Sequence, residues 1–399
     1  MKQIAPVRRY RHAEGFNIAL AEQPTWQRIL IRIVIPLGSC GAWIAAPQPP
    51  MVIPIGAAHL LEHLLSKQLA VAFGEQSLTQ YHALTSWWTT QFNTWTTKLV
   101  WSELEHALEV LCSPRFDYEW LQHEQQIITH EIRQRDAQIK YQLYRTMLET
   151  LYQQHPIRYG VTGTVADVAK ISLTELQVLH QAFYQPQHMT LWLAGPSERL
   201  NQLDRSGWLE AHPNPWINDQ LPEEPPHPRM PIQHIASNNP QPALRIAYKD
   251  QLTIPWLERR LTSELVLEGL LGLGSPLGKL RAQGEYSGDD YFGYSAISAS
   301  HSQPQALADL MQTQLEHFAL TLDEPRLDQL KRHLLLRYAI RYEQPEQLLS
   351  ELQTIERQQT SLEHLYKTLT TLDVATVSQR IQQHFIPEYR TLIVAQHSG

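Results

Sequence analysis

The sequence predicts an α+β fold made of two homologous α/β-sandwich domains, each with a mainly antiparallel sheet covered by helices. Three observations lead to this prediction. The chain has 399 residues, which is too long for one ordinary core, since domains usually hold about 100–200 residues. Prolines concentrate near the middle of the chain, and two similar segments lie 201 residues apart, one at the end of each half.

The prolines mark the boundary between the predicted domains. Nine of the 26 prolines fall between Pro213 and Pro242. Because proline lacks a backbone N–H and disfavours helix in the residue before it, this stretch predicts an extended linker. We therefore expect one domain over residues 1–212, a Pro-rich linker over 213–242, and a second domain over 243–399.

The similar segments read ISLTELQVLHQAFYQPQHMTLWLA (171–194) and LDVATVSQRIQQHFIPEYRTLIVA (372–395). They share five identities at the same offset, among them Pro186 with Pro387. Each predicts an amphipathic helix that stops before a proline and is followed by an apolar strand. Ser172 and Glu175 predict a capping box at the first helix start. Their place at the end of each half indicates a duplication.

Strands and long helices alternate in the first half. Residues 28–37 and 86–101 are rich in β-branched and aromatic residues, which predicts strands. Helical patterns cover 56–70, 102–112, 117–153 and 173–184. This mixture favours a sheet with helices covering one face.

The overall composition excludes some classes of partner. Lys and Arg number 33 against 40 Asp and Glu, a net charge of −7, which argues against nucleic acid or an anionic membrane as the main partner. Cys40 and Cys112 predict small buried hydrophobic residues in a reducing compartment rather than a disulfide. No apolar run approaches the ~20 residues needed to cross a bilayer, and the N-terminus lacks the apolar core of a secretory signal. We therefore expect a cytoplasmic protein.

The segment GAAHLLEHLLSK (56–67) contains residues that can bind a metal or take part in catalysis. In a helix, His59 and His63 share one face about one turn apart and can bind one zinc ion. Glu62 projects close to the same face, where it can act as a base toward an attacking water. The alternative is a leucine-rich core helix whose histidines are only hydrogen-bonded. Three suitable residues at these offsets favour the metal site, of the H-x-x-E-H type.

A catalytic zinc needs a third protein ligand, and residues 123–135, HEQQIITHEIRQR, offer candidates. Glu124 and Glu131 are seven residues apart and share one helical face. His123 and His130 do the same. Spacing alone does not choose between the two pairs, and the segment could also be a solvated polar stripe.

With these residues in view, the first half resembles the insulinase-like (pitrilysin) family of zinc peptidases, which includes the mitochondrial processing peptidases. The family has H-x-x-E-H followed by a helix with two glutamates seven apart. Here Glu131 lies 68 residues after His63, slightly fewer than usual. The resemblance implies zinc bound by His59, His63 and Glu131, with Glu62 as general base and Glu124 as a supporting carboxylate.

Two further segments extend the resemblance. HALTSWWTTQF (82–92) is similar to the family's N-A-x-T-S segment, although a histidine stands where asparagine is usual. It implies a strand edge that pairs with substrate, formed by His82, Ala83, Leu84 and Thr85. In the second half, residues 273–296 are similar to a segment whose arginine and tyrosine help hold substrate. This implies a role for Arg281 and for either Tyr286 or Tyr291, although these tyrosines could equally pack on a sheet.

The resemblance implies a zinc-dependent endopeptidase that acts on peptides or unfolded segments, with peptide or precursor processing as one role. Relatives enclose substrate in a chamber of four such domains, and this chain supplies two. A partner is therefore implied, either a second copy or a related subunit without zinc residues. No H-x-x-E-H follows the linker, so the second domain is expected to be zinc-free.

Two other hypotheses compete with the peptidase. The chain could be a non-catalytic scaffold subunit of a larger complex, or a metal-binding protein without enzymatic activity. The presence of Glu62 favours the enzyme, because simple metal storage needs no base beside the metal.

Overall fold

The computed structural model describes residues 7–40, 53–72, 81–203, 205–211, 221–237, 242–272 and 275–397. The chain forms two compact units. Unit 1 comprises Met1–Gln134 and Tyr159–Gln220, and unit 2 comprises Arg135–Arg158 and Leu221–Gly399. None of the helices in the described ranges has the length and apolar character needed to span a membrane.

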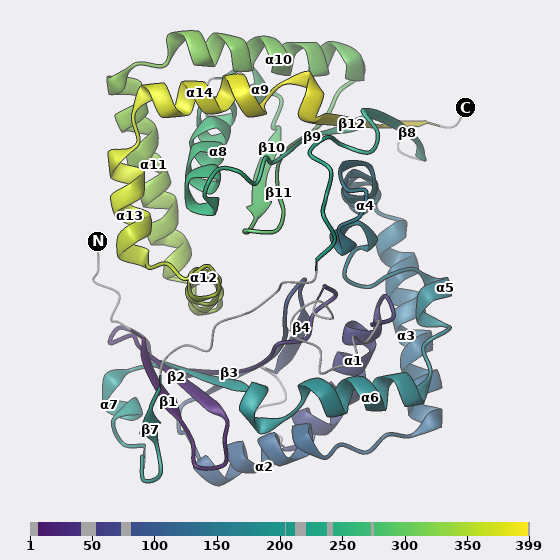
Figure 1. The fold of residues 1–399 in the computed structure, drawn as a ribbon, viewed down its shortest axis with the longest axis vertical. Coiled ribbons are helices and arrows are strands. Elements are labelled where there is room, and N and C mark those ends of the chain that lie inside the picture. Colours follow the sequence, from purple (N-terminus) through teal and green to yellow (C-terminus); the bar gives the residue numbers. More distant parts are fainter. Residues whose placement is uncertain are drawn as a thin grey trace. The chain divides into compact units, whose positions relative to one another are not determined.

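Within the described residues, unit 1 contains a seven-stranded sheet in the order β4-β5-β3-β6-β2-β1-β7. Its strands β1, β2, β3, β4 and β7 are labelled in Figure 1. Neighbouring strands are antiparallel except for β2 and β6, which are parallel. The strands are β1 (Arg8–Arg11), β2 (Asn17–Glu22), β3 (Ile29–Ile35), β4 (His82–Thr85), β5 (Thr90–Thr96), β6 (Thr190–Gly195) and β7 (Leu209–Glu210).

Helices of unit 1 bury their leucine-rich faces against this sheet. The core joins side chains of β2, β3 and β6 to those of α1, α2, α3 and α6. The helices are α1 (Ala57–Ala72), α2 (Trp101–Cys112), α3 (Tyr118–Asp136), α5 (Val165–Val168), α6 (Leu173–Phe183) and α7 (Ser197–Leu200), with the 3-10 turn η3 (Pro186–His188). The 3-10 turn η2 (Pro156–Tyr159) lies in unit 2 up to Arg158. As predicted, Ser172 and Glu175 form a capping box at the start of α6.

The described part of unit 2 contains a five-stranded sheet in the order β10-β11-β9-β12-β8, again antiparallel except for one pair, β12 with β8. Its strands are β8 (Ile232–Ser237), β9 (Ala243–Lys249), β10 (Gln283–Gly288), β11 (Gly293–Ser300) and β12 (Arg390–His397). Its helices are α4 (Ile139–Leu151), α8 (Trp256–Leu271), α9 (Pro276–Lys279), α10 (Pro304–Thr321), α11 (Glu324–Tyr342), α12 (Pro345–Arg357), α13 (Leu362–Thr371) and α14 (Val374–His384), with the turn η4 (Pro387–Tyr389).

The two halves repeat the same elements, which confirms the predicted pair of α/β domains. Helices α1 and α8 both have 16 residues, α3 and α11 have 19, α4 and α12 have 13, and α6 and α14 have 11. The final strands also match. Strand β6 is parallel to β2 and antiparallel to β3, just as β12 is parallel to β8 and antiparallel to β9.

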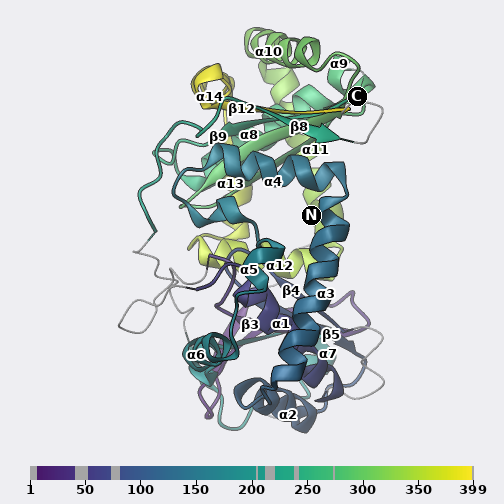
Figure 2. The ribbon, with the colours of Figure 1, turned by 90° about the vertical axis from the view of Figure 1, so that its right-hand side faces the viewer.

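Helix α4 comes from the first half of the chain but packs on the sheet of unit 2 (Figure 2). On one face of β9, Arg245 donates to the sulfur of Met147 in α4. On the opposite face, the ring of Tyr248 lies 5.1 Å from that of Phe385, just after α14. Helices therefore cover both faces of this sheet, rather than the one face that the sequence predicts. Every residue of β9 is buried as a result.

The boundaries differ from those predicted. Residues 135–158 pack with unit 2 although they lie within the range expected for the first domain. Strand β8 lies within the range expected to be linker, and residues 213–220 and 238–241 of that range lie outside the described residues. Strand β8 forms because its backbone adds to the edge of β12.

Two elements are shorter than predicted. The helix expected over 117–153 divides into α3 and α4 after Asp136, whose carboxylate and carbonyl accept hydrogen bonds from Arg145 and Gln142 of α4. The strand expected over 86–101 begins only at Thr90. The residues before it turn, and Ser86 N–H donates to Thr89 O at 2.8 Å.

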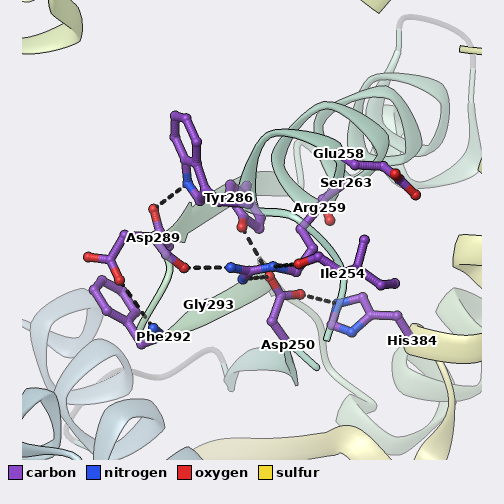
Figure 3. A network of polar contacts seen from close by, with 12 residues as sticks. Asp250, Ile254, Glu258, Arg259, Ser263, Tyr286, Asp289, Phe292, Gly293 and His384 are labelled. Atoms are coloured by element: carbon purple, nitrogen blue, oxygen red, sulfur yellow. Dashed lines mark hydrogen bonds and ion pairs between the residues drawn. The ribbon is translucent and has the colours of Figure 1, made fainter. Parts of the chain in front are cut away.

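A buried network of charges holds unit 2 together around Asp250 (Figure 3). The carboxylate accepts hydrogen bonds from Arg259 Nη1 at 2.9 Å and from the Tyr286 hydroxyl at 3.0 Å. Arg380 pairs with its other oxygen, and His384 Nε2 lies 3.2 Å from that oxygen. Burial raises the pKa of Asp250, but the cations Arg380 and Arg259 and the nearby His384 lower it to about 2. The carboxylate is therefore ionised and compensated.

This network gives the stability of the protein a dependence on pH. Burial, and next the positive charge of Arg380, lower the pKa of His384 to about 3. An unfolded imidazole takes up its proton near pH 6.5. Since only the unfolded state binds this proton between the two values, the stabilising contribution of the neutral imidazole is complete above about pH 6.5 and is lost as pH falls toward 3.

We predict that the free energy of unfolding falls between pH 7.5 and 5.5, and that it falls less in His384→Asn. The difference in slope should reach at most about 1.4 kcal/mol per pH unit, the value for one proton. Urea unfolding at several pH values measures it. His317→Gln, at an exposed position of α10, should keep the wild-type slope, whereas the wild-type slope in His384→Asn would contradict the prediction.

Candidate metal centre

Helix α1 begins at a position that requires glycine. Gly56 has a φ of 84°, in the left-handed region that side chains disfavour. A Cβ there would lie 2.6 Å from the carbonyl oxygen of Thr162. Gly56 also accepts the first helical hydrogen bond from Leu60 N–H. This start directs the buried leucines of α1 into the core and leaves His59, Glu62 and His63 at the side of the helix that α3 approaches.

The two histidines of α1 lie together. Their ring centroids are 4.8 Å apart and the rings are nearly perpendicular, at 79°. The Nε2 atom of His59 is 3.8 Å from Glu131 Oε2, and that of His63 is 3.7 Å from the same oxygen. The three residues place ligand atoms within 4.8 Å of one another. Among the described residues they form the group that could hold a metal ion.

Helix α3 directs its two glutamates toward α1, while its two histidines are exposed and His123 reaches Glu124 from outside, 3.4 Å from Nδ1 to Oε1. Glu124 is 3% exposed and Glu131 is half-buried, whereas His123 and His130 are exposed. His130 lies 2.9 Å from Gln134 on the outer surface. The geometry therefore favours the glutamates, where spacing alone left both pairs open.

Glu124 fixes the orientation of His63. The Nδ1–H of His63 donates to Glu124 Oε2 at 3.1 Å, which leaves Nε2 directed toward Glu131. Lys67 donates to the other carboxylate oxygen. Burial raises the pKa of Glu124, but these hydrogen bonds and the charge of Lys67 lower it to about 2. Such outer contacts fix the tautomer of a metal-binding histidine.

The electrostatics of the centre favour a cation. Burial lowers the pKa of His63, but the hydrogen bond to Glu124 and the charges of Glu62, Glu124 and Glu131 raise it above its ordinary value. Three carboxylates thus surround two imidazoles. Burial also raises the pKa of Glu62, against the hydrogen bond that its Oε2 accepts from Thr85 Oγ1 at 2.6 Å.

The chemistry and spacing of these residues fit zinc. Two imidazole nitrogens and one glutamate oxygen are the ligand set of one class of catalytic zinc site. Ligand atoms about 2.0–2.2 Å from a tetrahedral zinc lie about 3.4 Å from one another. The separations of 3.7 and 3.8 Å at Glu131 Oε2 need only a small side-chain adjustment to reach that value. Glu62 lies beside these ligands without being one of them.

Strand β4 forms an edge of the described sheet of unit 1. Its residues His82, Ala83, Leu84 and Thr85 pair with Asn93, Phe92, Gln91 and Thr90 of β5. His82 and Leu84 have exposed side chains, and Thr85 is buried against α1. The predicted substrate-binding segment is therefore an edge strand that contacts the metal-centre helix.

The residues predicted in the second half lie in unit 2. Arg281 is exposed, with a positive φ of 55°, in the turn between α9 and β10. The hydroxyl of Tyr286 donates to Asp250 within the buried network. The backbone N–H of Tyr291 donates to Asp289 at 2.8 Å. Residues 273 and 274 of the predicted segment lie outside the described residues.

Known proteins with similar sequences are named zinc proteases. No family model matches the sequence. The chain is 25% identical over 317 residues to the uncharacterized zinc protease YmfH of Bacillus subtilis, an alignment that covers 74% of this chain and 72% of YmfH.

Three solved structures share the fold. An M16-like peptidase from Alicyclobacillus acidocaldarius matches over 100% of both chains, with 20% identity and a TM-score of 0.83. An M16 peptidase inactive domain from Pseudomonas fluorescens matches over 99% of this chain and 98% of that one, with 16% identity and a TM-score of 0.75. Pitrilysin matches over 100% of this chain and 45% of its own, with 17% identity and a TM-score of 0.67.

The chain therefore resembles the insulinase-like (M16) peptidases, whose fold it shares. The relatives named zinc proteases support a metallopeptidase. One of the similar structures is described as an inactive domain, so the resemblance alone leaves catalysis to be argued from the residues of this chain.

Two features of the centre were missed by the sequence prediction, although signals for both were present. Lys67 follows His63 by four residues, so it lies on the same face of α1 and can reach the same carboxylate. Leu121 and Ile128 are buried in α3. Each precedes a glutamate by three residues, which places Glu124 and Glu131 near the core side of α3.

Proposed function

We propose that this chain is a zinc-dependent endopeptidase, or the catalytic subunit of one, that cleaves peptides and unfolded segments. One observation carries the proposal. Three metal-binding side chains, His59, His63 and Glu131, converge beside a buried carboxylate, Glu62, that is free of the ligand set. A site for metal storage or structure has no use for that carboxylate.

In the proposed reaction, His59, His63 and Glu131 hold zinc, which supplies Lewis acidity that polarises a peptide carbonyl and makes water easier to deprotonate. Glu62 takes a proton from the attacking water and passes it to the leaving amine. The burial that raises its pKa suits the first step, because a carboxylate with a raised pKa accepts a proton more readily. Glu124 and Lys67 keep His63 in the required tautomer.

We further propose that substrate adds as a strand to the edge of β4. Ser86 N–H bonds to Thr89 O, and hydrogen-bonded and non-hydrogen-bonded pairs alternate along an antiparallel ladder. The backbone N–H and C=O groups of Ala83 and Thr85 therefore point away from β5. The N–H of Thr85 is directed toward Glu62, whereas the groups of Ala83 and the C=O of Thr85 face the open edge. Main-chain pairing there supplies affinity with little sequence preference, and the exposed side chains of His82 and Leu84 flank the substrate.

In the second domain, Arg281 and Tyr291 are the proposed substrate contacts. The hydroxyl of Tyr286 is engaged by Asp250 in the buried network, which supports a structural role for that tyrosine. Because the chain spans 45% of pitrilysin, we propose that it completes a chamber by pairing with a second copy or a related subunit. The matching M16-like chain has the same two-domain extent. Processing of peptides or precursors is the corresponding role.

A non-catalytic scaffold is the second candidate. The likeness to an M16 inactive domain favours it. The presence of His59, Glu62 and His63 on one helix, with Glu131 within reach of both imidazoles, supports the enzyme instead.

We predict that Glu131→Gln loses stoichiometric zinc, because the neutral amide is a poor ligand and the remaining pair of imidazoles leaves the ion under-coordinated. His130→Ala, one residue away on the outer face of α3, should bind zinc as the wild type does. The zinc content of each purified variant, measured by mass spectrometry after gel filtration, tests this prediction. Zinc retained in Glu131→Gln and lost in His130→Ala would overturn the assignment.

We predict that the purified wild-type chain cleaves unstructured quenched-fluorescence peptides and that Glu62→Gln lowers kcat about 10²–10⁴-fold, the usual contribution of a general base. Zinc content should be unchanged. Glu119→Gln, exposed in the first turn of α3, is the matched control and should retain activity. Equal activity in wild type and Glu62→Gln would contradict the proposal. A wild-type chain that binds zinc but cleaves no peptide, either alone or with added related subunits, would favour the scaffold.

A further inference from the structure

Thr85 links the substrate-binding edge to the base. It is the last residue of β4 and is 6% exposed. Its hydroxyl lies 2.6 Å from Glu62 Oε2, a short contact between two buried groups from different elements. Such a contact from a hydroxyl to a carboxylate is among the stronger hydrogen bonds in proteins.

The direction of this hydrogen bond follows from counting protons. An ionised carboxylate only accepts, so the single proton of the Thr85 hydroxyl must point to Glu62. The neighbouring Thr90 hydroxyl, 3.4 Å from that of Thr85, donates its own proton to Leu37 O at 2.8 Å. Thr90 therefore does not compete for Glu62, and the hydroxyl of Thr85 is held toward one carboxylate oxygen.

The backbone of Thr85 points away from β5. The Thr85–Thr90 pair lies next to the hydrogen-bonded Ser86–Thr89 pair, so the N–H and C=O of Thr85 lie on the side of the open edge of β4. The N–H is directed toward Glu62. Burial raises the pKa of that carboxyl, whereas the hydroxyl and this N–H lower it. Thr85 thus holds the proposed base with its hydroxyl and N–H, and offers its C=O to an added strand.

We propose that Thr85 is a positioning residue that couples docking of a substrate strand on β4 to alignment of Glu62. This inference rests on the proposed peptidase function and adds a residue to it. A substrate paired with the backbone of Thr85 fixes β4 and, through the hydroxyl, fixes which oxygen of Glu62 is turned to the attacking water. Thr85 acts through Glu62 and does not itself touch the reacting atoms.

The test compares Thr85→Val, Thr85→Ser and a matched control, Thr94→Val. Valine keeps the shape of threonine without its hydroxyl, and serine restores the hydroxyl. Thr94 is also buried, on β5, so its replacement measures the effect of losing a buried hydroxyl from the sheet. In Thr85→Val we expect kcat to fall about 10- to 100-fold, as misplacement of a catalytic group does, with KM and zinc content unchanged. Thr85→Ser should recover most of the loss, and Thr94→Val should keep the wild-type kcat.

A second measurement does not depend on activity. In crystals of the zinc-free proteins, Glu62 should leave its wild-type position or adopt several rotamers in Thr85→Val, and keep its position in Thr85→Ser and Thr94→Val. A wild-type kcat in Thr85→Val, or a loss that serine does not recover, would overturn the coupling while leaving the peptidase proposal intact. Absence of cleavage by wild type would instead refute the peptidase proposal, and an unmoved Glu62 in the Thr85→Val crystals would refute the positioning role by itself.

Discussion

The approach of α3 to α1 is the contact on which the rest of the site depends. Two imidazoles one turn apart supply two ligand atoms, and the third comes from a different helix that must present Glu131 within 4 Å of both. The same approach places Glu124 on the back of His63 and Lys67 on Glu124. Burying these carboxylates is costly unless each is paired. The paired arrangement offsets that cost, and the proposed zinc ion between the imidazoles would offset it further.

The duplicated fold uses one structural position in two ways. Helix α1 carries histidines and a glutamate at its side, whereas α8, of the same length and order in the second half, buries Arg259 and Arg260. These arginines pair with Asp250 and Glu351. One half is therefore organised around groups that suit an added cation, and the other is neutralised by its own cations. This difference explains how the second half keeps charged residues in its core without the H-x-x-E-H pattern.

The sequence alone predicts the parts of the structure that are determined by residues close together in the chain. The pattern H-x-x-E-H fixes its own geometry in any helix, and the repeated helix, proline and strand at residues 171–194 and 372–395 appear in the structure as predicted. The break after Asp136 carries no glycine or proline, whereas the equivalent break before α12 is marked by Pro345. Strand β8 has no strong pattern of its own and forms by pairing with β12. The Thr85–Glu62 contact joins positions 23 residues apart, so no local sequence pattern predicts it.

The central claim is that His59, His63 and Glu131 hold one zinc ion beside Glu62. Anomalous diffraction at the zinc absorption edge, from crystals of the purified chain, tests it most directly. The account predicts one peak about 2.0–2.2 Å from the Nε2 atoms of both histidines and from a carboxylate oxygen of Glu131, with Glu62 outside bonding distance. A peak on His123 and His130, or no peak in a chain supplied with excess zinc, would contradict it.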